Sequence, residues 1–342
     1  MADEVEVVAI ADPRPGAAAA ACVAVRAWSP DATAYADAAD LLARSSLDAL
    51  INLTPAPSHA AVSGAALDAG VHVFSEKPLA GTIEEANELI DLAIQRRRLL
   101  LCAPGTAVTR HVRWLAEIAA SDRFGRLSLA VAQHADSGPA TWREYQGDPE
   151  VFYGPGVGPV FDHGIYRLHE MVALLGPVAA VQAMGAIGVP RRVVRGGPRA
   201  GETIKVTAPD HVLLNLRFAR GGLGQLLASF GTAATLAPWL ELHFERATIS
   251  FPGDPYSKDS PASLYVDDDT SLDLAGWTHG LQPPPPIEAR PVVETGIAHF
   301  VDCLRGARPI LTAETARHVL DVILKAYASI ADGRSHDTET TI

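Results

Sequence analysis

Four short apolar runs alternate with helix-like stretches in the first hundred residues, and this alternation constrains the fold more than any other feature of the chain. The runs cover residues 5–11, 47–52, 71–74 and 99–102. Apolar runs without polar alternation are typical of strands that are buried on both faces. The stretches that follow the first three runs have helical character. This order predicts right-handed βαβ units and a parallel sheet.

The pattern changes after about residue 125. Runs at 127–132, 211–218 and 223–228 are typical of an antiparallel sheet, and Ala-Arg-Gly-Gly at 219–222 predicts a hairpin turn between the last two. Residues 168–175 and 313–331 are expected to be helical. We therefore predict a Rossmann-like α/β domain over residues 1–104. An α+β domain with a large, mostly antiparallel sheet is expected over residues 105–342.

Composition excludes several classes of protein. The 342 residues carry a net charge of −12, which argues against a surface that binds nucleic acid or an anionic membrane. No apolar run reaches the roughly 18 residues of a membrane span. The start of the chain has no leader pattern and the three cysteines are far apart, which predicts a cytoplasmic protein. The twelve histidines lack the spacing of zinc-binding helices, so no metal site is expected.

A Glu76-Lys77-Pro78 motif directly follows the third predicted strand. Ligands of open α/β sheets bind at the carboxyl ends of the strands, so this position places Lys77 at a ligand crevice. Pro78 also allows the preceding peptide bond to be cis. Taken alone, the motif favours a turn with a solvated lysine, and only its context gives it a functional interpretation.

A glycine-rich loop over residues 154–158 leads to Asp162, His163 and Tyr166. Asp162 and Tyr166 are four residues apart and share one face if a helix begins near Asp162. A carboxylate and a phenol beside a lysine form a proton-transfer set. The alternative is structural: Asp162 caps the helix and Tyr166 packs in the core.

The order and spacing of four segments resemble the Gfo/Idh/MocA family, which includes glucose–fructose oxidoreductase and inositol dehydrogenase. The segments are Ala11-Asp12-Pro13, Thr54-Pro55 with His59, residues 73–80, and residues 158–166. The resemblance implies an NAD(P)-dependent oxidoreductase acting on a sugar, polyol or related cyclic alcohol. It implies that Lys77 is the catalytic lysine and that Asp162 orients the substrate. Tyr166 stands where many members have histidine, and is the expected proton donor.

The resemblance also implies cofactor and substrate contacts. An acid at Asp12 would bond the ribose hydroxyls of NAD, which we favour, whereas Arg14 could accept the 2′-phosphate of NADP. The full set of expected cofactor residues is Asp12, Arg14, Thr54, Pro55, His59 and Glu76. The expected substrate residues are Trp142, Arg143, His163 and His169. The broad sheet of the family implies a homo-oligomer, either a dimer or a tetramer.

One departure from the family pattern leaves the function open. The sequence has no G-x-G-x-x-G loop, and Met1 lies only 11 residues before Asp12, so the family's first strand and phosphate-binding turn are missing. We favour the interpretation that the protein extends upstream and is an ordinary dehydrogenase. In the second interpretation the loss is real, no cofactor binds, and Lys77, Asp162 and Tyr166 catalyse a dehydration, isomerisation or cyclisation. A third is a non-catalytic subunit that has kept the fold.

Overall fold

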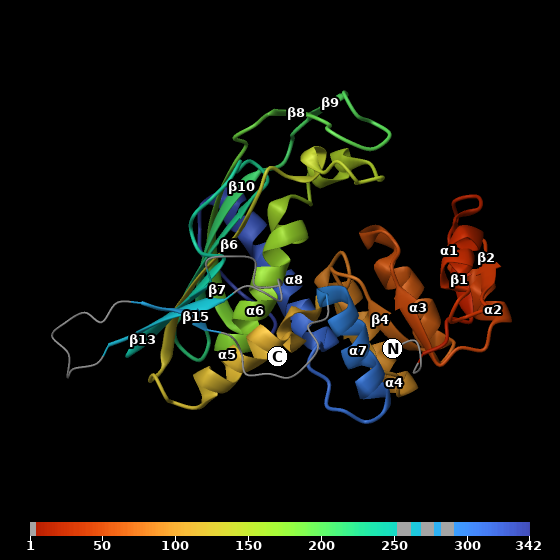
Figure 1. The fold of residues 1–342 in the computed structure, drawn as a ribbon, viewed down its shortest axis with the longest axis horizontal. Helices are drawn as coiled ribbons and strands as arrows, with labels where there is room; N and C mark the ends of the chain where they lie inside the picture. Colours follow the sequence, from red (N-terminus) through yellow and green to blue (C-terminus); the bar gives the residue numbers. More distant parts are fainter. Residues whose placement is uncertain (1–4, 252–260, 268–276, 282–290) are drawn as a thin grey trace. The chain divides into compact units, whose positions relative to one another are not determined.

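The computed structural model describes residues 5–251, 261–267, 277–281 and 291–342, and the chain divides into two units (Figure 1). The first unit comprises Met1–Ala103 and Gly296–Arg317. The second comprises Pro104–Thr295 and His318–Ile342.

The first unit has the predicted βαβ order. Its three-stranded parallel sheet has the order β3-β4-β5, and a second parallel pair joins β1 to β2. The elements are β1 (Ala9–Ala11), α1 (Ala17–Val25), β2 (Thr33–Tyr35), α2 (Ala38–Arg44), β3 (Ala49–Asn52), α3 (His59–Asp68), β4 (His72–Ser75), α4 (Ile83–Arg96) and β5 (Leu100–Cys102). The four predicted strands and three predicted helices are present, whereas β2 and α2 were not predicted. Both are short, and β2 is largely exposed, so neither leaves a clear apolar period.

Helix starts in this unit follow the expected local chemistry. The Thr82 hydroxyl accepts a hydrogen bond from Glu85 N, and the Glu85 carboxylate accepts one from Thr82 N, which completes the predicted capping box of α4. Such reciprocal bonds satisfy donors that a helix terminus would otherwise leave open.

The predicted second domain was wrong about residues 296–317, which pack into the first unit. This segment contains most of α7 (Val292–Leu304) and the start of α8 (Ala313–Asp332). The Phe300 ring lies 5.7 Å from that of Phe74, and Cys102 N donates to Leu311 O at 3.1 Å. Apolar burial against β4 and a backbone bond to β5 therefore attach the segment to the parallel sheet, a long-range pairing that local sequence cannot show.

A nine-stranded sheet dominates the second unit, in the order β15-β14-β13-β12-β6-β11-β10-β7-β16. Its strands are β6 (Leu127–Ala135), β7 (Val178–Ala186), β10 (His211–Phe218), β11 (Leu223–Ser229), β12 (Leu240–Phe244), β13 (Ala247–Phe251), β14 (Ala262–Val266), β15 (Thr278–Leu281) and β16 (His336–Asp337). Only the pairing of β6 with β11 is parallel, so the mostly antiparallel prediction is confirmed. The predicted hairpin joins β10 to β11.

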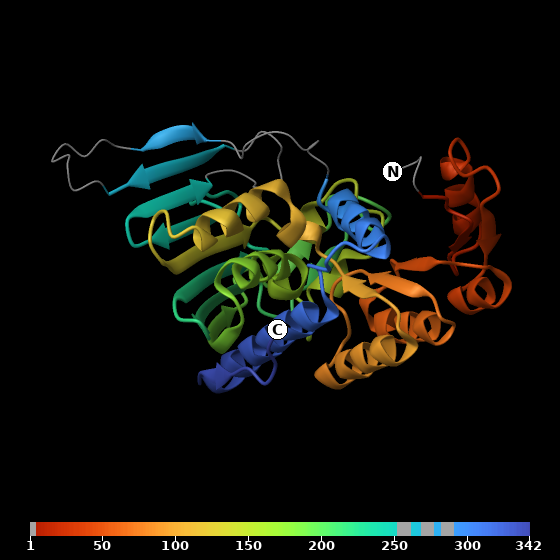
Figure 2. The same ribbon diagram turned by 90° about the horizontal axis from the view of Figure 1, so that it is seen from below.

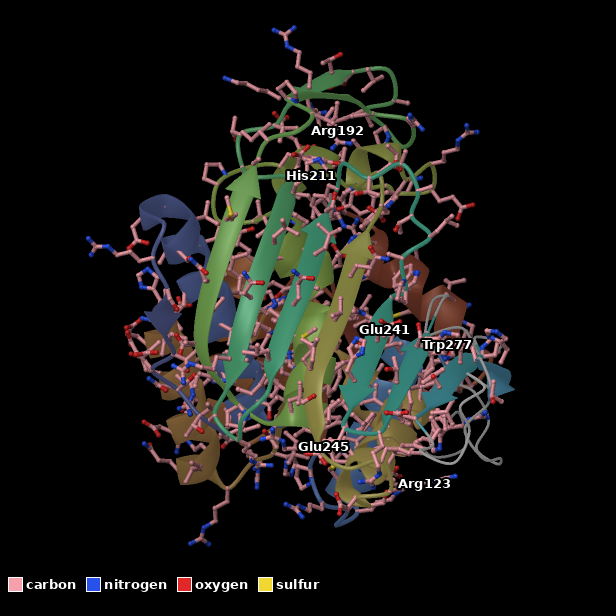
Figure 3. The ribbon with its side chains drawn as sticks, turned by 90° about the vertical axis from the view of Figure 1, so that its left-hand side faces the viewer. Arg123, Arg192, His211, Glu241, Glu245 and Trp277 are labelled. Carbon is pink, nitrogen blue, oxygen red and sulfur yellow. The ribbon has the colours of Figure 1, made fainter. Side chains whose placement is uncertain are left out.

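Helices cover one face of this sheet. α5 (Arg110–Ala120), α6 (Ile165–Leu175) and the second-unit part of α8 share a core with the inward side chains of the strands (Figures 1 and 2). Strand β10 alternates regularly, with Leu214 and Leu216 buried and Leu213 and Asn215 exposed. The outward face is seen head-on in Figure 3, with Glu241 on β12 and with Arg192 and His211 near one end of the strands. No described helix is long and apolar enough to span a bilayer.

Candidate active site

Polar side chains follow the parallel strands of the first unit, at their carboxyl ends. Asp12 comes directly after β1 and pairs with Arg14: Asp12 Oδ1 accepts from Arg14 N at 2.8 Å, and Oδ2 lies 2.7 Å from Arg14 Nη2. The hydrogen bonds from Arg14 lower the pKa of Asp12 to about 2. Asp12 is therefore an ionised acceptor at neutral pH, and each carboxylate oxygen can accept a further bond.

The turn after β3 is fixed by Asn52. Its Nδ2 donates to His59 O and to Ser63 Oγ, each at 3.0 Å, and its Oδ1 accepts from the Thr54 hydroxyl at 2.7 Å. Thr54 is thereby oriented just before Pro55, which precedes a short 3-10 helix over Ala56–Ser58. Asn52 is 2% exposed, so this orientation is held from within the fold.

His59 lies behind this turn and joins it to the lysine motif. Its Nδ1 is 2.6 Å from Pro78 O and its Nε2 is 2.7 Å from Thr54 O, and the residue is 2% exposed. Both ring nitrogens face carbonyl oxygens, so neither is directed at a cofactor. The geometry therefore makes His59 a positioning residue that ties the Thr54 turn to the Pro78 turn, rather than the direct cofactor contact expected from the sequence.

Glu76 and Lys77 directly follow β4. Lys77 N donates to Glu76 Oε2 at 3.0 Å, Glu76 N donates to Asn52 O at 2.9 Å, and the Lys77–Pro78 peptide bond is cis. Both side chains are half-buried. Lys77 thus lies at the carboxyl edge of the parallel sheet, where the sequence placed it, on a turn whose backbone is bonded to β3 and to His59.

In the second unit, a π-helical turn carries Asp162 and His163. This turn, Val160–Gly164, runs directly into α6, which carries Tyr166. Asp162 N donates to Gly158 O at 3.2 Å, and Gly158 has a φ of 106°, in the region that favours glycine. The sequence predicted a helix start near Asp162 but not its wider winding. π-Helical turns of this kind are frequent at functional sites.

His163 lies between two carboxylates. Its Nε2 is 3.3 Å from Asp162 Oδ2 and its Nδ1 is 3.9 Å from Asp136 Oδ1. The imidazole is 7% exposed and stacks between the rings of His134, at 4.0 Å, and Trp142, at 5.5 Å. Stacking and charge together fix the ring, and with it the Asp162 carboxylate beside it.

More aromatic side chains surround this pair. The His134 ring lies 6.2 Å from that of Tyr166 and 5.0 Å from that of Trp239. Tyr145 contacts Trp142 edge-on at 6.0 Å, and burial with the nearby charges of Asp162 and Asp148 raises the Tyr145 pKa. We call Asp162, His163, Tyr166, His134, Trp142 and Trp239 the second-unit cluster.

The four residues expected to contact the substrate lie in different surroundings. Trp142 and His163 belong to the second-unit cluster. Arg143 is exposed on the adjoining loop. His169 does not fit the expectation: it is 4% exposed in the core, where burial and the neighbouring His318 lower its pKa to about 3. A neutral, buried histidine is a packing group, so the expectation that His169 contacts the substrate does not fit the structure.

Sequence reasoning missed Asp136 and Trp239, and gave His134 no role. His134 and Asp136 lie at the end of β6, and Trp239 directly precedes β12, which pairs with β6. The one available signal was the H-x-D pattern at the end of a predicted strand. The approach of Trp239 depends on sheet pairing between segments about a hundred residues apart.

The first unit offers suitable groups for the ends of a dinucleotide. Asp12 supplies an ionised acceptor for ribose hydroxyls, and Thr54, Glu76 and Lys77 offer hydroxyl, carboxylate and ammonium groups at the ends of β3 and β4. Among the described residues, no cluster of histidine, cysteine and acidic side chains is arranged to hold a metal.

Comparison with known proteins bears on the family and the fold of the chain. The chain matches an oxidoreductase family with an NAD-binding Rossmann fold (Gfo/Idh/MocA) over residues 1–103, and the Gfo/Idh/MocA C-terminal domain over residues 112–250. It is 33% identical over 203 residues to dTDP-3,4-didehydro-2,6-dideoxy-alpha-D-glucose 3-reductase from Streptomyces antibioticus, which covers 57% of each chain. It is 28% identical over 191 residues to levoglucosan dehydrogenase from Pseudarthrobacter phenanthrenivorans, covering 52% of this chain and 47% of that protein. The chain spans about half the length of the curated relatives it matches.

Solved structures share the fold over nearly the whole chain. A levoglucosan dehydrogenase in complex with NADH and levoglucosan has a TM-score of 0.78 at 21% identity, covering 98% of this chain and 90% of that one. An oxidoreductase from Agrobacterium radiobacter in complex with NAD+, L-tartaric acid and magnesium has a TM-score of 0.75 at 19% identity, covering 96% and 90%. With both family domains matched in order and the fold shared throughout, the chain belongs to the Gfo/Idh/MocA family of oxidoreductases.

Proposed function

We propose that the protein is an NAD-dependent oxidoreductase that acts on a hydroxyl-bearing carbon of a sugar, polyol or related cyclic alcohol. The observation that carries the proposal is the second-unit cluster, in which Asp162 and Tyr166 accompany stacked aromatic rings. Trp142 and Trp239 are only partly buried, and aromatic rings suit the apolar faces of a pyranose, whereas a carboxylate suits its hydroxyls. Relatives named as a levoglucosan dehydrogenase and a dTDP-sugar reductase support a sugar-derived substrate.

The proposal assigns a separate task to each catalytic side chain. When bound, the nicotinamide accepts or supplies the hydride at the reacting carbon. Asp162 accepts a hydrogen bond from a substrate hydroxyl and so orients the ring. Tyr166 takes the proton from the reacting hydroxyl, or returns it to the carbonyl oxygen in reduction. The positive charge of Lys77 stabilises the oxyanion that develops at that oxygen.

We propose NAD rather than NADP as the cofactor. Asp12 is ionised, and a second anion, the 2′-phosphate of NADP, would be repelled by it. Arg14 could attract that phosphate, but its Nε and Nη2 already donate hydrogen bonds to the Asp12 carboxylate. Thr54 and Glu76 are the further side chains that we assign to the cofactor.

A substrate screen with matched variants tests this function. Neutral and acidic sugars, polyols and anhydrosugars are offered with NAD, and their ketones with NADH, while nicotinamide absorbance is followed. Lys77→Met, Asp162→Asn and Tyr166→Phe should each lower kcat by about 10²–10⁴-fold. Combining Lys77→Met with Tyr166→Phe should cost far less than the product of the single losses, because the proposal has both residues act at the same reacting oxygen.

Two results would overturn the assignment. Full activity of all three variants would remove the proposed residues from the reaction. Turnover that requires Lys77 but no nicotinamide would replace the redox reaction with the acid–base alternative, a dehydration, isomerisation or cyclisation.

We also propose that the protein forms a homo-oligomer through the open face of the large sheet and works in the cytoplasm. Paired residues on that face are apolar and exposed: Met184, which is 75% exposed, faces Leu213, which is 49% exposed. Exposed apolar patches on a sheet mark interaction surfaces. Cys22, Cys102 and Cys303 are free thiols, which suits a reducing compartment. Light scattering of a Leu213→Asp variant should show dissociation to monomers, and an unchanged mass would exclude this face.

A further inference from the structure

A cavity of about 320 Å³ opens in the second unit, at the end of the sheet labelled by Arg192 in Figure 3. Three arginines line it together with small and uncharged residues. The lining is Ser137, Thr141, Val189, Arg191, Arg192, Val193, Arg195, Gly231 and Ala233. None of these described lining residues is acidic, although the whole chain carries a net charge of −12. The surface of the cavity is mostly apolar, and the three arginines are the only charged residues among the described ones that line it.

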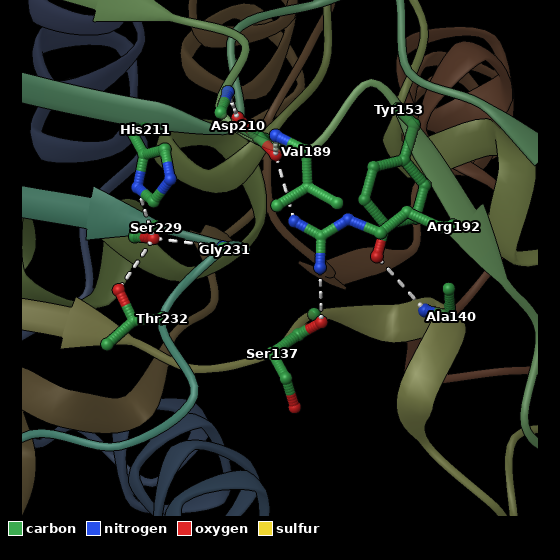
Figure 4. A network of polar contacts seen from close by, with 12 residues as sticks. Ser137, Ala140, Tyr153, Val189, Arg192, Asp210, His211, Ser229, Gly231 and Thr232 are labelled. Atoms are coloured by element: carbon green, nitrogen blue, oxygen red, sulfur yellow. Dashed lines mark hydrogen bonds and ion pairs between the residues drawn. The ribbon is translucent and has the colours of Figure 1, made fainter.

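Arg192 is a buried and fixed part of this wall. It is 8% exposed, its Nη2 pairs with Asp210 Oδ2 at 2.8 Å, and its Nη1 donates to Ser137 O at 3.1 Å (Figure 4). Its Nε has no hydrogen-bond partner among the described residues. The guanidinium is therefore a fixed part of the wall, and Asp210 supplies its counter-charge.

Arg191 and Arg195 supply the uncompensated charge. Asp210 neutralises Arg192, whereas neither Arg191 nor Arg195 forms an ion pair within the described part of the chain. Both residues are exposed and line the cavity, so their guanidinium groups are accessible to a ligand from solvent. Two arginines without an ion-pair partner in the described part of the chain therefore line the cavity.

The backbone around the arginines is held rigidly. Arg195 N donates to Ala140 O at 2.7 Å. A Cβ at Gly196 would lie only 2.2 Å from Arg143 O, so the loop after Arg195 packs directly on the loop that carries Trp142. On the opposite wall, Gly231 N donates to Ser229 Oγ at 3.0 Å.

The cavity adjoins the second-unit cluster through consecutive residues. Thr141, in its lining, directly precedes Trp142, which stacks on His163. Ser137, also in its lining, directly follows Asp136, which lies 3.9 Å from the same imidazole. The cavity and the second-unit cluster are therefore formed by neighbouring residues of the same two chain segments.

We propose that this cavity binds the anionic group, a phosphate or a carboxylate, of the substrate whose ring occupies the second-unit cluster. The inference deepens the proposed function and rests on it for the identity of the ring. Arginine presents paired N–H donors that match the oxygens of both anions, which is why it is the usual residue at such sites. The substrate class is thus an acidic sugar derivative rather than a neutral sugar.

Calorimetric titration without nicotinamide tests the site directly. The probes are inorganic phosphate, glucose 6-phosphate and glucuronate, with glucose as the neutral comparison. The double variant Arg191→Gln/Arg195→Gln should bind the preferred anion about tenfold or more weakly, and added salt should weaken binding to the wild type. Arg217→Gln is the matched control, because it removes an exposed arginine of β10 that does not line the cavity.

Each outcome decides the inference. Loss of anion binding in the double variant, but not in Arg217→Gln, supports it, and the stronger of glucose 6-phosphate and glucuronate identifies the anion as phosphate or carboxylate. No measurable binding of any anion, or equal binding by the double variant, overturns it. The titration contains no nicotinamide, so it tests the anion site separately from the reaction. If an anion binds here but no sugar is oxidised in the substrate screen, the proposed function is refuted and the anion site remains supported.

Discussion

The ion pair between Arg192 and Asp210 allows the sharpest stability prediction. The Asp210 carboxylate is 1% exposed and accepts from Gly188 N at 2.6 Å, Val189 N at 3.1 Å and Arg192 Nη2 at 2.8 Å. In Asp210→Asn, the side-chain NH2 group replaces one acceptor oxygen and faces N–H donors that it cannot bond. The buried Arg192 guanidinium also loses its counter-charge. Removing one partner of a buried pair costs about 3–5 kcal/mol, so we expect a loss of that size.

The same chain contains a matched exposed pair. Arg217 Nη2 lies 3.3 Å from Asp337 Oδ1, with side-chain exposures of 60% and 82%. Asp337→Asn should therefore cost less than about 1 kcal/mol. Urea unfolding followed by tryptophan fluorescence is a suitable assay, because four of the five tryptophans belong to the second unit. Equal losses in the two variants would refute the reasoning from burial.

Three further predictions concern other parts of the molecule. Asp12→Ala should weaken NADH binding about tenfold. NADPH binding should stay equal or become tighter, because Arg14 loses its partner Asp12 and can contact the 2′-phosphate. An unchanged ratio of NADH to NADPH affinity in fluorescence titrations would exclude Asp12 as the ribose ligand. The pKa of His169 is lowered from 6.5 to about 3. Between these values the unfolded chain binds a proton that the folded chain does not, so the free energy of unfolding falls as the pH drops below 6.5. His169→Leu should remove up to about 1.4 kcal/mol of this loss per pH unit, and parallel profiles of unfolding free energy against pH for the two proteins would contradict the prediction. Phe300→Ala should destabilise the first unit by about 3–5 kcal/mol, whereas Val293→Ala, at a 58% exposed position of the same helix, should have almost no effect; urea unfolding followed by circular dichroism, which reports on both units, is the measurement.

Much of the fold was predictable because it is written in local patterns. Parallel strands such as β5 are apolar throughout, β10 alternates between buried and exposed residues, and Thr82 with Glu85 marks a helix start. The errors arose where distant segments decide the outcome. The packing of Phe300 on Phe74 joins segments more than two hundred residues apart, and no local signal assigns them to one unit.

The candidate site was predictable in its residue types and less so in its detail. Lys77 lies at a strand end and Asp162 at a helix start, as their motifs indicated. The stacking of His163 between His134 and Trp142 depends on three separate segments meeting, which spacing alone does not show. His59 and His169 illustrate the opposite limit: their motif positions suggested ligand contact, and only burial shows that they act inside the fold.

Direct titration of the purified protein with NADH tests the central claim, that the chain is a nicotinamide-dependent oxidoreductase. Energy transfer from tryptophan to the bound nicotinamide gives the signal, and NADPH serves as the comparison. The account predicts saturable binding of NADH, stronger than that of NADPH and weakened by Asp12→Ala. Absence of saturation with either nucleotide at millimolar concentration, by protein that is folded by circular dichroism, would contradict it.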